Sequence, residues 1–79
     1  MTRKDRLLKK FLKNPDSLKF NEIEKLLLHF GYRRVRINGS HYRYRHRLSR
    51  DLLTFPVHHN NCKRKYKIEL VKLIINKLL

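Results

Sequence analysis

The chain has 79 residues, and its 21 lysines and arginines against 6 aspartates and glutamates give a formal net charge of +15. A chain this short supports one domain with a modest core, so any site is expected at the surface and to be built from few residues. The charge indicates a polyanionic or acidic partner, and the apolar residues interleaved with it exclude a disordered basic tail.

Residues 4–13 predict a basic amphipathic helix, because apolar side chains recur at helical spacing: Leu7, Leu8, Phe11 and Leu12. Asn14-Pro15-Asp16-Ser17 is expected to end this helix. A second helix follows, with Asn21 as its N-cap and Glu24 three residues later, as in a capping box. Gly31 stands where a left-handed terminator belongs. The apolar stripe of the second helix is Ile23, Leu26, Leu27 and Phe30.

The hydrophobic period then changes from helical to alternating. Residues 32–37 and 40–47 predict two strands of a hairpin, and residues 52–57 predict a third strand in which Pro56 indicates an edge position. Residues 66–79 predict a closing helix. Three short antiparallel strands need a covered face, which apolar helix stripes supply. The predicted fold is an α+β two-layer sandwich in the order α-α-β-β-β-α, with the other face of the three-stranded antiparallel sheet open.

Asn38-Gly39 is the strongest hairpin signal in the chain, and as the centre of a type I′ turn it pairs Arg36 with His41 and Arg34 with Arg43. Alternation then sends one set of side chains to the core: Val35, Ile37, Tyr42, Tyr44, Leu53, Phe55 and Val57. The open face receives the others: Arg34, Arg36, His41, Arg43, Arg45, Thr54 and His58. Like charges opposite one another destabilise a sheet, so this face is interpreted as a phosphate-binding surface.

His41 is the residue on this face that is suited to move a proton. The surrounding positive charge disfavours imidazolium and leaves a neutral imidazole that accepts a proton. RNA carries its own nucleophile, the 2′-hydroxyl, so cleavage needs only a base, charge stabilisation and orientation. We therefore expect no metal and no other cofactor. On composition alone, a histidine beside basic residues is more often a binding contact than a catalyst.

Three motifs occur in order along the chain: Phe30-Gly31-Tyr32, Asn38-Gly39-Ser40-His41 and Thr54-Phe55-Pro56-Val57-His58. They resemble the HicA family of toxins, whose core combines a helix, G-[FY], a G-S-H hairpin and a T-[IF]-P-x-H motif. The later Asn60-Asn61-Cys62-Lys63 and Tyr66 resemble a segment of one branch of that family. The resemblance runs from about Leu18 to the last helix, with His59 as an additional residue and residues 4–13 outside it.

The resemblance implies a toxin of a type II toxin–antitoxin pair that cleaves mRNA without the ribosome, on a fold similar to the double-stranded-RNA-binding domain. It implies His41 as the catalytic residue, with Gly39 and Ser40 as motif partners, and a HicB-like antitoxin that covers the site. The residues expected to bind RNA or phosphate are Ser40, Arg34, Arg36, Arg43, Arg45, His58, Lys63, Arg64 and Lys65. The free protein is expected to be a monomer or small homo-oligomer.

Two other functions fit the residues. One is a non-catalytic RNA-binding module that recognises shape and backbone, and the other is a basic protein with only an acidic protein partner. Among individual residues, Tyr42 and Tyr44 either stack bases or lie in the core, and the register favours the core. His58, His59 and Cys62 lie close together but lack a fourth ligand at zinc-like spacing, so no metal site is expected.

A lone cysteine, Cys62, fits a reducing compartment and is expected to be inert. The basic N-terminal segment has no signal-like apolar run, and no stretch approaches the roughly 18 apolar residues of a membrane span. The sequence thus predicts a soluble cytoplasmic protein. Residues 1–79 are expected to form one domain, with the leading helix in residues 1–16 and the family core in residues 17–79.

Overall fold

The computed structural model describes residues 2–79, so the first residue of the predicted leading segment 1–16 lies outside the described residues. The expected α+β order is confirmed, with bounds that differ from the prediction by one or two residues at most ends. The elements are α1 (Arg3–Lys13), the 3₁₀ turn η1 (Pro15–Ser17), α2 (Phe20–His29), β1 (Tyr32–Asn38), β2 (His41–His46), β3 (Leu52–Pro56), α3 (Arg64–Leu73) and the π-helical turn η2 (Ile74–Leu78).

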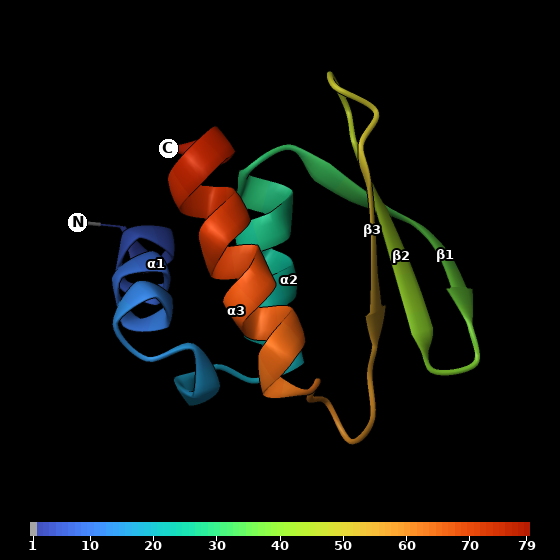
Figure 1. Cartoon of the computed structure of the whole chain (residues 1–79), viewed down its shortest axis with the longest axis horizontal. Coiled ribbons are helices and arrows are strands. Elements are labelled where there is room, and N and C mark those ends of the chain that lie inside the picture. The colour runs from blue at the N-terminus through green and yellow to red at the C-terminus, as the bar shows by residue number, and fades with distance from the viewer. Residues whose placement is uncertain (1) are drawn as a thin grey trace.

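The helices lie on one side of the sheet (Figure 1). The strand order is β1-β2-β3 with both pairs antiparallel, so β3 is an edge strand, as Pro56 indicated. Helices α2 and α3 pack between the sheet and α1 (Figure 1). The fully buried side chains come from every layer: Tyr32, Tyr44, Phe11, Leu18, Ile23, Leu26, Leu27 and Ile74. The sheet face that looks away from the helices is therefore free to carry polar residues.

The leading helix α1 is part of this packing. The Thr2 hydroxyl accepts a hydrogen bond from the Asp5 amide at 3.2 Å, and the Asp5 carboxylate accepts one from the Thr2 amide at 3.1 Å, which caps the helix start. Leu7 and Phe11 lie in the core on the inner face of α1, and Phe11 is 0% exposed. The predicted amphipathic character thus reflects packing onto the α2–α3 layer.

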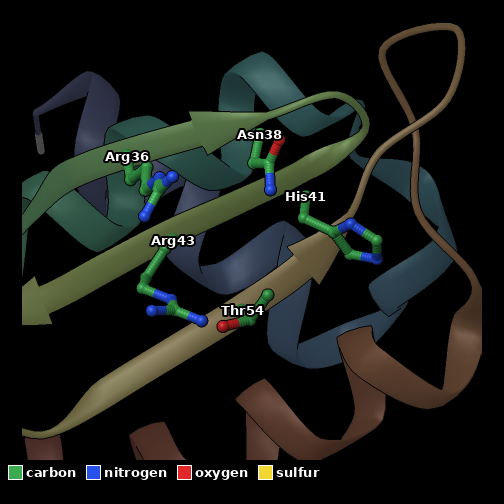
Figure 2. A pocket seen from close by; sticks show the side chains of 5 residues that line it. All are labelled: Arg36, Asn38, His41, Arg43 and Thr54. Atoms are coloured by element: carbon green, nitrogen blue, oxygen red, sulfur yellow. The ribbon is translucent and has the colours of Figure 1, made fainter.

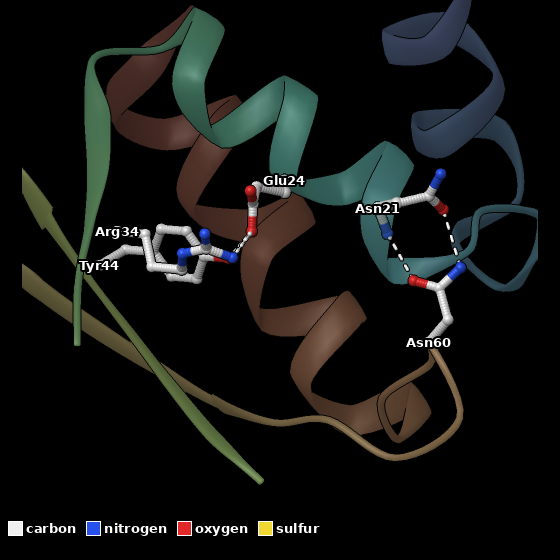
Figure 3. Close-up of polar contacts among 5 residues, drawn as sticks. All are labelled: Asn21, Glu24, Arg34, Tyr44 and Asn60. Carbon is white, nitrogen blue, oxygen red and sulfur yellow. Dashed lines mark hydrogen bonds and ion pairs between the residues drawn. The ribbon is translucent and has the colours of Figure 1, made fainter. Parts of the chain in front are cut away.

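Helix α2 begins differently from the prediction. Asn21 is not the N-cap, because the helix starts at Phe20 with Lys19 as the N-cap, whose amide donates to the Glu22 carboxylate at 3.1 Å. The first two amides of the helix are instead satisfied by Asn60, from the loop after β3. Its carbonyl accepts from the Phe20 amide at 2.8 Å. Its Oδ1 accepts from the Asn21 amide at 3.0 Å, and its Nδ2 donates to Asn21 Oδ1 at 2.9 Å (Figure 3). We call the two side-chain bonds the Asn21–Asn60 clamp.

The hairpin register differs from the predicted one. Gly39 and Ser40 occupy the turn, and the observed pairs are Asn38 with His41, Ile37 with Tyr42 and Arg36 with Arg43. A glycine at the first central position, here with φ of 61°, suits a type II′ turn and outcompetes the type I′ alternative at Asn38-Gly39. Moving the turn by one residue changes the pairing by two positions. Every residue near the turn therefore stays on its predicted face.

A bulge in β1 reverses the faces farther along the strand. Val35 is the extra residue between Arg34 and Arg36, so Arg34 pairs with Tyr44, not with Arg43, and shares its helix-facing side. The bulge lets Tyr32 lie in the core, 2% exposed, while Arg36 stays on the open face. The predicted core positions of Val35 and Ile37 are wrong, since they are 44% and 47% exposed at the bulge and near the tip of an edge strand.

Candidate functional site

Five side chains from three neighbouring strands line a pocket of about 190 Å³ on the open face: Arg36, Asn38, His41, Arg43 and Thr54 (Figure 2). Four of them were predicted to share this face. Asn38 was missed, because only the observed register places it directly opposite His41. The pocket thus combines two guanidinium groups, an imidazole, an amide and a hydroxyl. These groups can bind a phosphate and exchange a proton with it.

The charges in this pocket are not balanced by carboxylates. Arg36 and Arg43 are direct cross-strand partners. Within residues 2–79 the ion pairs are Arg34 with Glu24 at 3.5 Å and Arg64 with Asp16 at 2.6 Å, and neither involves a pocket arginine. Two adjacent uncompensated guanidinium groups repel each other, so an anion between them is favourable.

A larger cleft of about 560 Å³ adjoins the arginine pocket and shares His41 with it. The rest of its wall comes from the end of β3, the turn after it and the first residues of α3. The lining residues from these segments are Pro56, His58, Asn61, Cys62, Lys63, Lys65 and Tyr66. Three predicted RNA-binding residues, His58, Lys63 and Lys65, are thereby brought together. Tyr66 was not predicted as a site residue, and the Lys65 ammonium lies 5.0 Å from the centre of its ring. We call this space the His41–His58 cleft.

The turn after β3 holds the backbone of His58 firmly. His58 and Asn61 exchange two backbone hydrogen bonds, with N–O distances of 2.8 and 3.0 Å. His59 and Asn60 between them have φ values of 52° and 57°, as the central residues of a type I′ turn do. The additional residue His59 is accommodated here, and the His58 side chain is left exposed at the rim of the cleft.

Four of the residues predicted to bind RNA or phosphate lie outside both pockets: Ser40, Arg34, Arg45 and Arg64. Arg34 faces α2 because of the β1 bulge and pairs with Glu24. Arg64 extends from the start of α3 to the carboxylate of Asp16. Arg45 is exposed on β2, opposite Arg33. Of the motif partners of His41, Gly39 supplies the positive φ of the turn, and the Ser40 carbonyl accepts a hydrogen bond from the Val57 amide at 2.7 Å.

On the helix side of the sheet, Tyr44 and Arg34 converge on Glu24 (Figure 3). The buried Tyr44 hydroxyl donates a hydrogen bond to Glu24 Oε2, the oxygen that Arg34 also contacts. Burial, followed by the Glu24 contact, raises the pKa of the Tyr44 hydroxyl and keeps it a donor. Tyr44 is thus a core residue, as the register favoured, and this group stabilises the α2–sheet contact.

The remaining groups considered from the sequence are the Cys62 thiol and possible metal ligands. Burial raises the pKa of the Cys62 thiol, against the smaller opposing effect of Lys67, so the thiol is protonated at neutral pH. Within residues 2–79 no three His, Cys, Asp or Glu side chains gather at a distance suited to a metal ion. In that same range no helix combines the length and apolar character needed to cross a membrane.

A family model described as the HicA toxin of bacterial toxin–antitoxin matches residues 20–77. The chain belongs to the HicA toxin family. The match runs from the start of α2 into η2 and includes every residue of both pockets, whereas α1 precedes it. Membership makes the HicA chain part of a toxin–antitoxin system and implies a cognate antitoxin. No curated protein and no solved structure gave a significant match.

Proposed function

We propose that this HicA toxin is a metal-independent endoribonuclease that cleaves mRNA without the ribosome, with His41 as its catalytic residue. The observation that carries the proposal is the position of His41, whose exposed imidazole borders both the arginine pocket and the His41–His58 cleft. A phosphate held by Arg36 and Arg43 lies next to that imidazole, and the neighbouring nucleotide extends into the cleft.

The chemistry needs no external nucleophile. His41 accepts the proton of the RNA 2′-hydroxyl, the 2′-oxygen forms a bond to phosphorus, and the bond from phosphorus to the 5′-oxygen breaks. The leaving 5′-oxygen takes up a proton. Arg36 and Arg43 stabilise the negative charge that develops on the phosphorane oxygens. The products are a 2′,3′-cyclic phosphate and a 5′-hydroxyl, and DNA is not a substrate because it lacks the nucleophile.

The surrounding cations extend the RNA path. Lys63 and Lys65 in the cleft, and Arg45 on the open face, bind flanking phosphates. Arg34 and Arg64 are left out, because each is paired with a carboxylate of the chain itself. A HicB-like antitoxin with acidic groups complements the same basic face and blocks RNA by covering it.

The test compares the protein with two single-histidine variants on a long unstructured RNA in EDTA. His41→Ala should bind RNA but cleave it at least about 100-fold more slowly. His29→Ala is the matched control, because His29 is exposed at the end of α2 on the helix side of the molecule. It should cleave at the normal rate, and circular dichroism should show both variants folded.

The product ends and the sugar are independent checks. A 2′,3′-cyclic phosphate at the cut, and resistance of a substrate with a single 2′-deoxy position there, support the mechanism. RNA binding without cleavage by all three proteins would replace it with a non-catalytic RNA-binding module. Cleavage that requires an added divalent cation would refute the metal-independent step.

A further inference from the structure

The His41–His58 cleft contains a second imidazole to which the proposed mechanism gives no chemical role. His58 lies two residues beyond the end of β3, and His41 is the first residue of β2 and pairs with Pro56, the last residue of β3. Both side chains are exposed and line the same cleft. Among residues 2–79, no other histidine lines this cleft.

The backbone holds these two histidines in a fixed relation. Ser40 precedes His41, and Val57 precedes His58. A 2.7 Å hydrogen bond from the Val57 amide to the Ser40 carbonyl joins these two preceding residues. On the other side, His58 is tied to Asn61 by the two bonds of the type I′ turn, and the Asn21–Asn60 clamp anchors that turn to α2. A pair of proton-transfer groups needs this kind of support from rigid elements.

Cleavage through the 2′-hydroxyl involves two proton transfers. One proton leaves the attacking 2′-oxygen, and another must reach the 5′-oxygen, which is otherwise expelled as an unstable alkoxide. We propose that His58 in its imidazolium form donates the second proton to the leaving 5′-oxygen, while His41 accepts the first. This inference rests on the proposed function.

The RNA and the two histidines account for every bond and proton of this step. The P–O5′ bond breaks as the 2′-oxygen–phosphorus bond forms, His41 becomes imidazolium and His58 becomes neutral imidazole. Exchange of protons with water then returns both rings to their starting states. Lys63 and Lys65, which line the cleft with His58, hold the phosphate on the leaving side.

The experiment varies the leaving group. RNA cleavage first locates a preferred site, and two oligonucleotides are then made around it, one natural and one with sulfur in place of the bridging 5′-oxygen. A thiolate leaves without being protonated, so the sulfur substrate does not need a general acid. His58→Ala should cleave the natural substrate at least about 100-fold more slowly than the unaltered protein, yet cleave the sulfur substrate within about 10-fold of it.

Three variants complete the comparison. His58→Gln, which cannot transfer a proton, should behave as His58→Ala does, and His41→Ala should be slow on both substrates. His59→Asn removes the neighbouring imidazole, which does not line the cleft, and asparagine tolerates the left-handed backbone there. It should leave both rates unchanged.

The outcomes separate the proposals. If the unaltered protein leaves natural RNA intact, the proposed function fails, and the role of His58 fails with it. If the unaltered protein cleaves and His58→Ala is equally slow on both substrates, His58 only binds or positions RNA, and the proton-donor role is refuted while the nuclease stands. A normal rate for His58→Ala on natural RNA would refute it in the same way.

Discussion

Substitutions at Asn60 separate two contributions to the free energy of unfolding. One is the pair of side-chain hydrogen bonds in the Asn21–Asn60 clamp, and the other is the left-handed backbone conformation of Asn60. Asn60→Gly removes both side-chain bonds to Asn21, of 3.0 and 2.9 Å, but keeps the φ of 57° accessible. The two bonds are exposed, so their loss should lower the free energy of unfolding by about 1 kcal/mol. Asn60→Ala adds the cost of a left-handed alanine, about 1 kcal/mol more.

Equilibrium urea unfolding, followed by circular dichroism, measures both losses. The order of stability should be the unaltered protein, then Asn60→Gly, then Asn60→Ala, with each step lowering the melting temperature by roughly 4–8 °C. Asn21→Ala removes only one of the two bonds and should fall between the unaltered protein and Asn60→Gly. Equal destabilisation by glycine and alanine would contradict the backbone argument, and losses below about 0.5 kcal/mol for both would show that the clamp contributes nothing.

Three further predictions concern other parts of the molecule. Phe11→Ala should lower the free energy of unfolding by about 3–5 kcal/mol, because this α1 side chain is fully buried; a loss below about 1 kcal/mol in thermal or urea unfolding would mean that α1 is not docked. Arg43→Ala should weaken RNA binding about 10-fold and lower the salt dependence of binding (the slope of log K against log salt concentration) by about one. Arg34→Ala should change neither, because Arg34 is paired with Glu24. Equal effects of the two variants in filter binding would contradict the assignment of the two arginines to opposite faces of the sheet. Cys62 should react with iodoacetamide more slowly than free cysteine at pH 7.5, because its raised pKa leaves little thiolate. Its rate should approach that of free cysteine only at higher pH or in urea. A rate equal to that of free cysteine in the folded protein at pH 7.5 would refute this.

Local patterns were sufficient for the element order and for much of the site. Helical and alternating hydrophobic periods are set by backbone geometry, so they located the helices and strands to within a few residues. The face of Arg36, His41 and Arg43 was also predictable, because the observed turn shifts the pairing by two residues and an even shift preserves alternation. The β1 bulge was signalled only indirectly. In a regular strand, Tyr32 and Arg36 would lie on the same face, because they are separated by an even number of positions. The structure instead buries Tyr32 and exposes Arg36, which requires the extra residue of the bulge.

The sequence by itself determined the charge, the order of elements and the exposed imidazole at position 41, since composition and periodicity act over a few neighbouring residues. Only the tertiary structure decided that Arg34 faces Glu24, that Asn60 completes the start of α2 and that His58 joins His41 in one cleft. Each of these contacts joins segments at least ten residues apart. Their geometry depends on how a bulge, a turn and the packed helices position distant backbones, which no local pattern encodes.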